Sequence, residues 1–183
     1  MRLRVHSCPF AALCLACGAA LSAPAPLTLA PLRTGEAEVR AAPGGMPCFT
    51  LAEREERRSG ARSFQAVTVT ALAGKARATM WAMAMPAGRT FPLMFSMCVP
   101  YAGRVPSLPQ ENAELLEAGK LYEVLIEVRP GDTPGQPAAY AGRFCLARQA
   151  DGSKLVRMLA PTARSAAACA AAAPVAPPAR RVQ

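Results

Sequence analysis

The sequence predicts an all-β fold, a small antiparallel β-sandwich of the immunoglobulin or fibronectin type with flexible extensions at both ends. Short segments rich in β-branched and aromatic residues alternate between apolar and polar positions, as strands do. Turn-forming residues separate these segments at intervals of about ten residues, a spacing typical of sandwiches. The part of the chain with this pattern, residues 46–160, is long enough to bury a core of its own.

The clearest strand signal is Leu121–Val128, where apolar side chains occupy alternate positions. We therefore predict that Val124 and Ile126 face the core, while Glu123 and Glu127 lie on the opposite face. The same reasoning predicts further strands over Phe64–Leu72, Ala76–Met85, Tyr140–Arg148 and Ser153–Leu159.

Turn and helix signals connect these strands. The proline- and glycine-rich segment Pro130–Pro137 is expected to join two strands as a hairpin, and Asp151-Gly152 predicts another tight turn. A helix of about two turns is predicted over Glu111–Ala118, because Gly119 stands where many helices end. The mixed-charge run Glu53–Arg62 is interpreted as a solvated loop or helical turn, with a partner-binding loop as the alternative.

The N-terminus has the features of a secretory signal over residues 1–22: a short basic start, an apolar run and small residues near Ser22. An alternative cleavage precedes Cys17, which would then carry the lipid of a lipoprotein. Ala16 suits that interpretation, whereas Cys14 stands where a leucine is usual. Either cleavage predicts a periplasmic protein, and the second would attach it to a membrane through the lipid on Cys17.

Two segments outside the predicted domain have a low-complexity composition. Residues 23–45 are rich in Pro, Ala and Gly and are expected to form a flexible tether. Residues 161–183 form an Ala- and Pro-rich tail. Apart from the N-terminal run, no segment of the sequence is long and apolar enough to predict a membrane span.

Four cysteines remain after the signal: Cys48, Cys98, Cys145 and Cys169. An even number in an oxidising compartment favours disulfides, and four cysteines allow three pairings. No C-x-x-C pair is present after the signal, which argues against a zinc site or a thioredoxin-like redox function.

The residues needed for most catalysis are absent from the mature sequence. The one histidine, His6, lies in the signal, so no imidazole remains for Ser-His-Asp or Cys-His chemistry. No nucleotide-binding loop occurs either. We predict a protein that is not an enzyme and has no cofactor. The formal charge of +9 comes from scattered arginines, without the basic stripe and interleaved aromatics of nucleic-acid binders, so no nucleic-acid partner is expected.

Methionine is locally enriched at positions 80, 83, 85, 94 and 97. Thioether sulfurs bind Cu(I), which makes a copper-binding protein one alternative function. Met83 and Met85, however, share a predicted strand face with Trp81, as in an ordinary soft-packed core. We therefore predict no metal site.

Four stretches occur in an order and spacing that resemble a known family: Cys48–Thr50, Cys98–Gly103, Gly119–Val124 and Tyr140–Leu146. Together they resemble the type VI secretion immunity periplasmic lipoproteins. The resemblance implies a compact β domain that neutralises a secreted protein toxin by non-covalent binding. The alternative is a structural or accessory envelope lipoprotein without a toxin partner.

Two expectations about residues accompany this resemblance. A Cys48–Cys98 disulfide is predicted, because both cysteines open strand-like segments and both lie in the matching stretches. Charge and expected exposure then select the candidate partner-binding residues, which are Arg54, Arg57, Arg58, Arg62, Tyr101 and Arg104.

Overall fold

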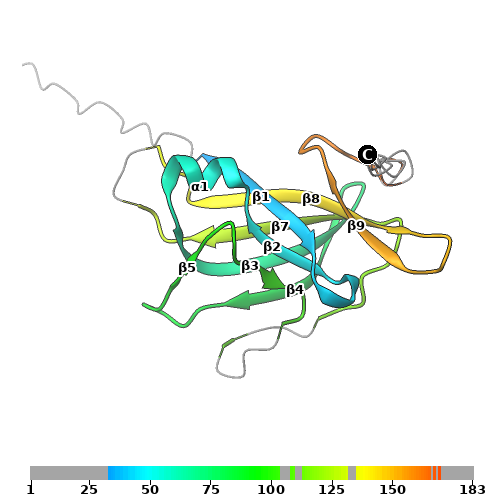
Figure 1. Cartoon of the computed structure of the whole chain (residues 1–183), viewed down its shortest axis with the longest axis horizontal. Coiled ribbons are helices and arrows are strands. Elements are labelled where there is room, and N and C mark those ends of the chain that lie inside the picture. Colours follow the sequence, from blue (N-terminus) through cyan, green and yellow to red (C-terminus); the bar gives the residue numbers. More distant parts are fainter. Residues whose placement is uncertain are drawn as a thin grey trace, which may run out of the picture. The chain divides into compact units, whose positions relative to one another are not determined.

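The computed structural model describes residues 33–103, 108–109, 113–131, 135–165, 167 and 169. In order along the chain, its elements are β1 (Thr34–Ala41), the short 3-10 helix η1 (Pro43–Gly45), β2 (Pro47–Leu51), α1 (Glu53–Ser59), β3 (Arg62–Ala73), β4 (Ala76–Ala84), β5 (Phe91–Leu93), β6 (Val99–Pro100), β7 (Leu121–Val128), β8 (Ala139–Arg148) and β9 (Lys154–Leu159) (Figure 1). The all-β prediction is confirmed. Among the described residues, no helix has the length and apolar character needed to cross a membrane.

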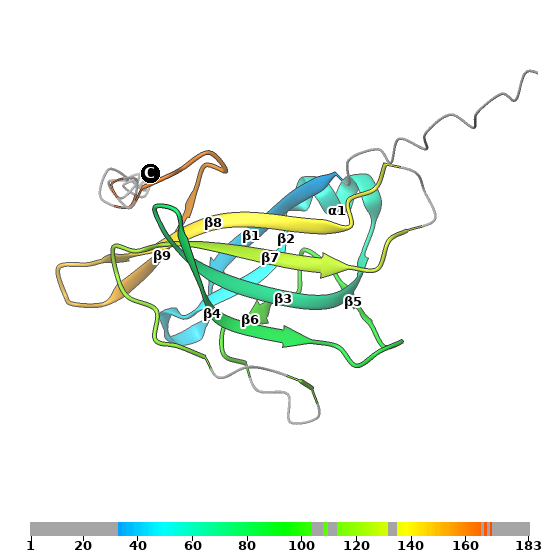
Figure 2. The same ribbon diagram turned by 180° about the vertical axis from the view of Figure 1, so that it is seen from behind.

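The strands form one nine-stranded sheet, whose main path runs β4-β3-β7-β8-β1-β2-β6. β5 also pairs with β3, and β9 with β8. Every named strand pair is antiparallel except β1 with β8, so the sheet is mixed. Figures 1 and 2 show this sheet curling into a half-barrel. The predicted separation into two immunoglobulin-like sheets is not confirmed.

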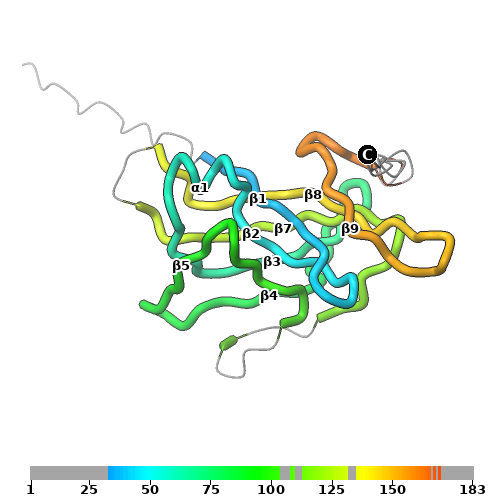
Figure 3. The backbone as a smooth tube through the Cα atoms, viewed as in Figure 1, coloured from blue at the N-terminus to red at the C-terminus, as the bar shows by residue number. Residues whose placement is uncertain are grey.

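The curl brings the two ends of the strand order toward each other around one core. Phe144 of β8 lies 5.4 Å from Tyr122 of β7 and 5.7 Å from Phe49 of β2, measured between ring centroids. Phe49 in turn lies 6.4 Å from both Trp81 of β4 and Tyr101. This row of rings therefore joins strands that are far apart in the sheet, and Figure 3 shows β1 and β2 passing across β3 and β7.

The predicted strands are found close to their expected positions. β7 has the predicted bounds, and Val124 and Ile126 are fully buried in the core, as predicted. The turn at Asp151-Gly152 is also confirmed, since Gly152 has a positive φ of 83° and its N–H donates to the carbonyl of Gln149. β7 and β8 pair as the expected antiparallel hairpin; residues 132–134 of its connection lie outside the described residues.

The predicted helix over Glu111–Ala118 is wrong for the residues described, 113–118, which are not helical. The N–H of Glu114 donates to the carbonyl of Met80, and Ala118 forms a parallel bridge with Leu146. A two-turn helix has little stability of its own, because helix nucleation is costly. Hydrogen bonds to the sheet and burial of Leu116 therefore determine the conformation.

The folded domain begins earlier than predicted, because β1 lies within the expected tether. Its side chains at Ala37 and Val39 are buried. A Cβ built at Gly142 of β8 would lie 2.8 Å from the carbonyl oxygen of Ala37, so the glycine allows the two backbones to approach closely. Small residues gave β1 a weak hydrophobic pattern. The signal, Cys17 and residues 23–32 lie outside the described residues.

Candidate partner-binding surface

Two disulfides hold the domain together. Cys48 of β2 is bonded to Cys98, which lies just before β6, with Cα atoms 5.5 Å apart. This pairing confirms the prediction. Cys145 of β8 is bonded to Cys169, with Cα atoms 6.0 Å apart, and Cys169 is buried. Disulfides of this kind indicate an oxidising compartment.

The charged run identified in the sequence forms α1 between β2 and β3. Glu53, Glu55 and Glu56 lie in its first turn, and Arg57 and Arg58 in its last. This order places negative charge at the positive end of the helix dipole and positive charge at the negative end, which stabilises the short helix. The helix ends at Gly60, where φ is 68° and the N–H donates to the carbonyl of Glu56.

Carboxylates fix α1 to its neighbours. Glu55 is only 3% exposed, and its Oε1 lies 3.4 Å from the guanidinium of Arg33 and 3.7 Å from that of Arg58. Glu56 accepts a hydrogen bond of 2.8 Å from the backbone N–H of Phe95. Arg54 is ion-paired with Glu36 of β1. The helix is therefore attached both to β1 and to the segment after β5.

Three of the predicted partner-binding residues lie together on α1. The side chains of Arg54, Arg57 and Arg58 are 64%, 68% and 56% exposed. Each is ion-paired within the chain. The Arg57–Glu53 pair is exposed on both sides, and such pairs contribute little free energy, about 0–1 kcal/mol. Arg58, in contrast, pairs with the buried Glu55. A carboxylate on another protein can therefore replace the partner of Arg57 at small cost, and can share Arg54 and Arg58 with their intrachain carboxylates. The planar guanidinium favours two-pronged carboxylate binding.

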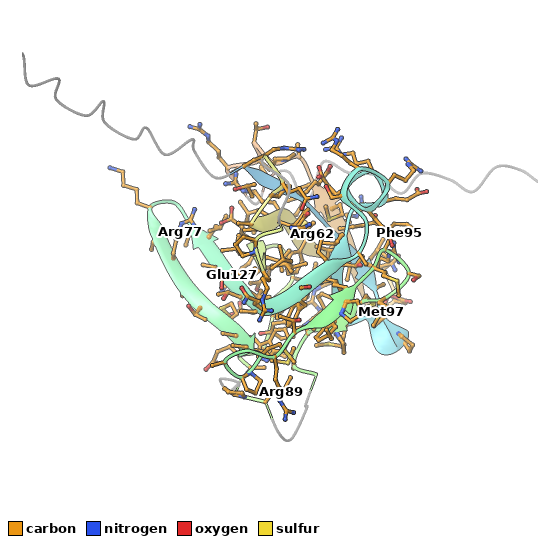
Figure 4. The ribbon with its side chains drawn as sticks, turned by 90° about the vertical axis from the view of Figure 1, so that its left-hand side faces the viewer. Arg62, Arg77, Arg89, Phe95, Met97 and Glu127 are labelled. Atoms are coloured by element: carbon orange, nitrogen blue, oxygen red, sulfur yellow. A yellow bond between two sulfur atoms is a disulfide. The ribbon has the colours of Figure 1, made fainter. Side chains whose placement is uncertain are left out.

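The exposure assumed for Arg62 and Tyr101 is not observed. Arg62 is 6% exposed, because it occupies an inward-facing position at the start of β3. Its guanidinium donates to the side-chain oxygen of Gln136 and to the carbonyl of Pro137, and Figure 4 shows it among the central strands. Tyr101 is 5% exposed and belongs to the core. Arg104 lies outside the described residues.

The structure adds residues that the sequence analysis missed. The guanidinium of Arg40 lies 3.9 Å from the ring centroid of Phe95, a cation–π contact. Met97 follows nearby and is 39% exposed (Figure 4). The N–H of Phe95 donates to Glu56 of α1, so Phe95 and Arg40 adjoin the helix, and Met97 lies two residues further along the same segment. We call this surface the α1 face, and it consists of Arg40, Arg54, Arg57, Arg58, Phe95 and Met97.

The methionines do not share one environment. Met83 is buried in the core, and Met80 and Met85 pack against it. Met97 is exposed on the α1 face. In the part of the chain that the structure describes, no group of three or more His, Cys, Asp or Glu side chains is placed to hold a metal ion.

Tyr101 is predicted to make the stability of the protein fall at alkaline pH. Its hydroxyl lies 2.6 Å from the carbonyl of Glu114 and 3.0 Å from that of Met80. Burial raises the pKa of Tyr101 to about 12, with smaller contributions from Tyr122 and Glu114. The unfolded hydroxyl has a pKa of about 10. The resulting stabilisation is complete below pH of about 10 and is lost as the pH rises through 12.

We therefore expect Tyr101→Phe to reduce the alkaline loss of stability and to cost about 0.5–1.5 kcal/mol at neutral pH, through the lost hydrogen bond. Urea unfolding at pH 7 and at a series of alkaline pH values measures both effects. An unchanged dependence on pH in the variant would show that Tyr101 does not contribute to it.

Comparison of the chain with protein-family models, with curated proteins and with solved structures finds no match in any of the three.

Proposed function

We propose that this chain is a periplasmic, non-enzymatic binding protein that neutralises a secreted protein toxin, with the α1 face as its contact surface. A lipid on Cys17 would hold it at the membrane. The motif resemblance supports this function, and the two disulfides are typical of an exported domain.

The α1 face is the observation that most supports a binding function. Interface residues that contribute most free energy are commonly aromatic or arginine side chains surrounded by more polar contacts. Here the Phe95 ring, covered by Arg40, lies beside the exposed arginines of α1. The surface would fit a partner that presents carboxylates around an apolar contact.

The anchoring of α1 supports the same role. Glu55 and Glu56 hold the helix through Arg33 and the Phe95 N–H. The backbone that carries the exposed arginines is therefore already held in place before a partner binds. A preorganised surface loses less conformational entropy when it binds. Opposite charges on the partner would also raise the association rate.

The test is rescue of a sensitive host. Each product of a neighbouring gene would be directed to the periplasm, with and without this protein, and growth would be measured. Rescue that requires export of this protein, together with co-purification of the toxic product, is the expected result. If no neighbouring product is toxic, or if rescue fails, the protein is better described as an accessory envelope protein.

The double variant Arg54→Ala/Arg57→Ala tests the surface. Both side chains are exposed, so folding should be retained, and the Kd for the toxin is expected to rise about tenfold or more. The matched control is Arg89→Ala/Arg148→Ala, which removes two exposed arginines elsewhere. Equal Kd values for the two double variants, measured by calorimetry, would place the interface away from α1.

A further inference from the structure

A pocket of about 690 Å³ lies at the end of β3 opposite to α1. The β3–β4 hairpin forms one side, and residues 119–121 and 164–165 form the other. Figures 1 and 2 show the hairpin tip and the segment after β9 at the same end of the sheet. This volume is within the range of small-molecule sites, about 300–1,000 Å³.

The lining of the pocket is mainly apolar. It includes Ala71, Leu72, Ala78, Met80 and Leu121, which come from β3, β4 and the start of β7. The small alanines leave the space open, while the Leu and Met side chains supply apolar contact area. An apolar chain entering here would leave water for a hydrocarbon surface, which is favourable.

Three cations also line the pocket: Arg77, Lys120 and Arg164. Arg77 is 2.9 Å from Glu123, and Lys120 is 2.7 Å from Glu117. Arg164 is exposed and has no ion pair within the described residues. Glu123 is also paired with Arg143, so the two carboxylates offset only part of the charge of four cations, and positive charge remains beside the apolar pocket.

Several contacts hold the segments on this side in place. The guanidinium of Arg143 donates to the carbonyl of Ala163, next to Arg164. The N–H of Gly119 donates to the carbonyl of Leu146 on β8. The Sγ of Cys169, which is bonded to Cys145, lies 3.9 Å from the carbonyl of Lys120. The pocket is therefore formed by segments attached to the sheet.

We infer that this pocket binds a single-chain anionic amphiphile, such as a long-chain fatty acid. The hydrocarbon chain would lie against the apolar lining. The carboxylate would lie at the cationic side, where Arg164 offers a guanidinium that forms no ion pair with a carboxylate of the described residues. This site is separate from the α1 face and does not depend on the proposed toxin.

Titration of the purified mature chain with cis-parinaric acid, followed by fluorescence, tests the inference. Saturable one-site binding is expected. Dodecanoic acid should displace the probe at least tenfold more effectively than 1-dodecanol, because only the acid has a charged head group. Absence of saturable binding would overturn the proposal, as would equal competition by the acid and the alcohol.

Two tryptophan variants locate the site. Ala78→Trp fills the pocket from an exposed position, so the protein should remain folded and bind the probe at least tenfold more weakly. Ala87→Trp places the same side chain at an exposed position outside the pocket and should bind as the unmodified protein does. Circular dichroism would verify the fold of both variants.

Equal affinities of the two folded variants for the probe would overturn the assignment of the site to this pocket. Binding only to vesicles of anionic phospholipid would also overturn it, because it would indicate a membrane-surface contact instead.

Discussion

Replacing Phe144 by Ala is expected to lower the free energy of unfolding by about 3–5 kcal/mol, the range for deleting a buried aromatic side chain. Phe144 is fully buried and contacts both Tyr122 and Phe49. Its ring therefore connects β7 and β8 with β2 across the curl of the sheet. Removing the Phe144 ring would leave a cavity at the centre of the row of aromatic rings in the core, since the neighbouring rings are themselves held by other contacts.

Phe91→Ala is the matched control, because it deletes the same atoms from a different place. Phe91 is only half-buried and lies at the short edge strand β5, stacked on Phe64 at 4.6 Å. We expect a clearly smaller loss of stability there. Urea unfolding of both variants measures the difference. Similar losses would mean that Phe144 contributes no more to stability than an aromatic side chain at the edge of the sheet.

Replacing Cys48 and Cys98 together by Ala is the second change with a large expected effect, a loss of about 2–4 kcal/mol in the free energy of unfolding. The bond joins cysteines 50 positions apart and attaches the segment before β6 to β2. Without it, the unfolded chain gains conformational freedom. In the folded state the short β2–β6 pairing, the hydrogen bond from the Tyr101 N–H to the Pro47 carbonyl and the burial of Val99 would then hold this edge of the sheet.

The Cys145→Ala/Cys169→Ala variant provides the comparison. Its bond spans 24 positions, so the chain-entropy account predicts a somewhat smaller loss. Urea unfolding of both variants, combined with mass spectrometry of unreduced peptides from the unmodified protein, tests the stability and the pairing. Free thiols at Cys48 and Cys98, or an unchanged unfolding midpoint in their variant, would contradict this prediction.

Local patterns were sufficient to predict the longer strands. In β7 every second side chain is apolar, and that period of two is a property of the strand itself. The turn at Asp151-Gly152 followed from the tolerance of glycine for positive φ. The Cys48–Cys98 bond was predicted with the help of the motif resemblance, and the structure confirms it.

The candidate binding surface was predicted only in part. Arg54, Arg57 and Arg58 were recognised from charge, and their exposure follows from their place on a short surface helix. Arg40 and Phe95 could not be paired from the sequence, because they are distant along the chain and meet only when β1 and the segment after β5 pack together.

The pattern of residues was enough to predict that the chain is rich in strands, where most of those strands lie, and which cysteines are available for disulfides. The folded structure was needed to establish the order and curl of the sheet, the presence of strand β1, and the burial of Arg62 and Tyr101. It also decided that Glu111–Ala118 does not form the predicted helix over its described residues. Each of these features depends on contacts between distant segments. The free energy of those contacts exceeds the weak local preferences, and the contacts leave no pattern in either segment alone.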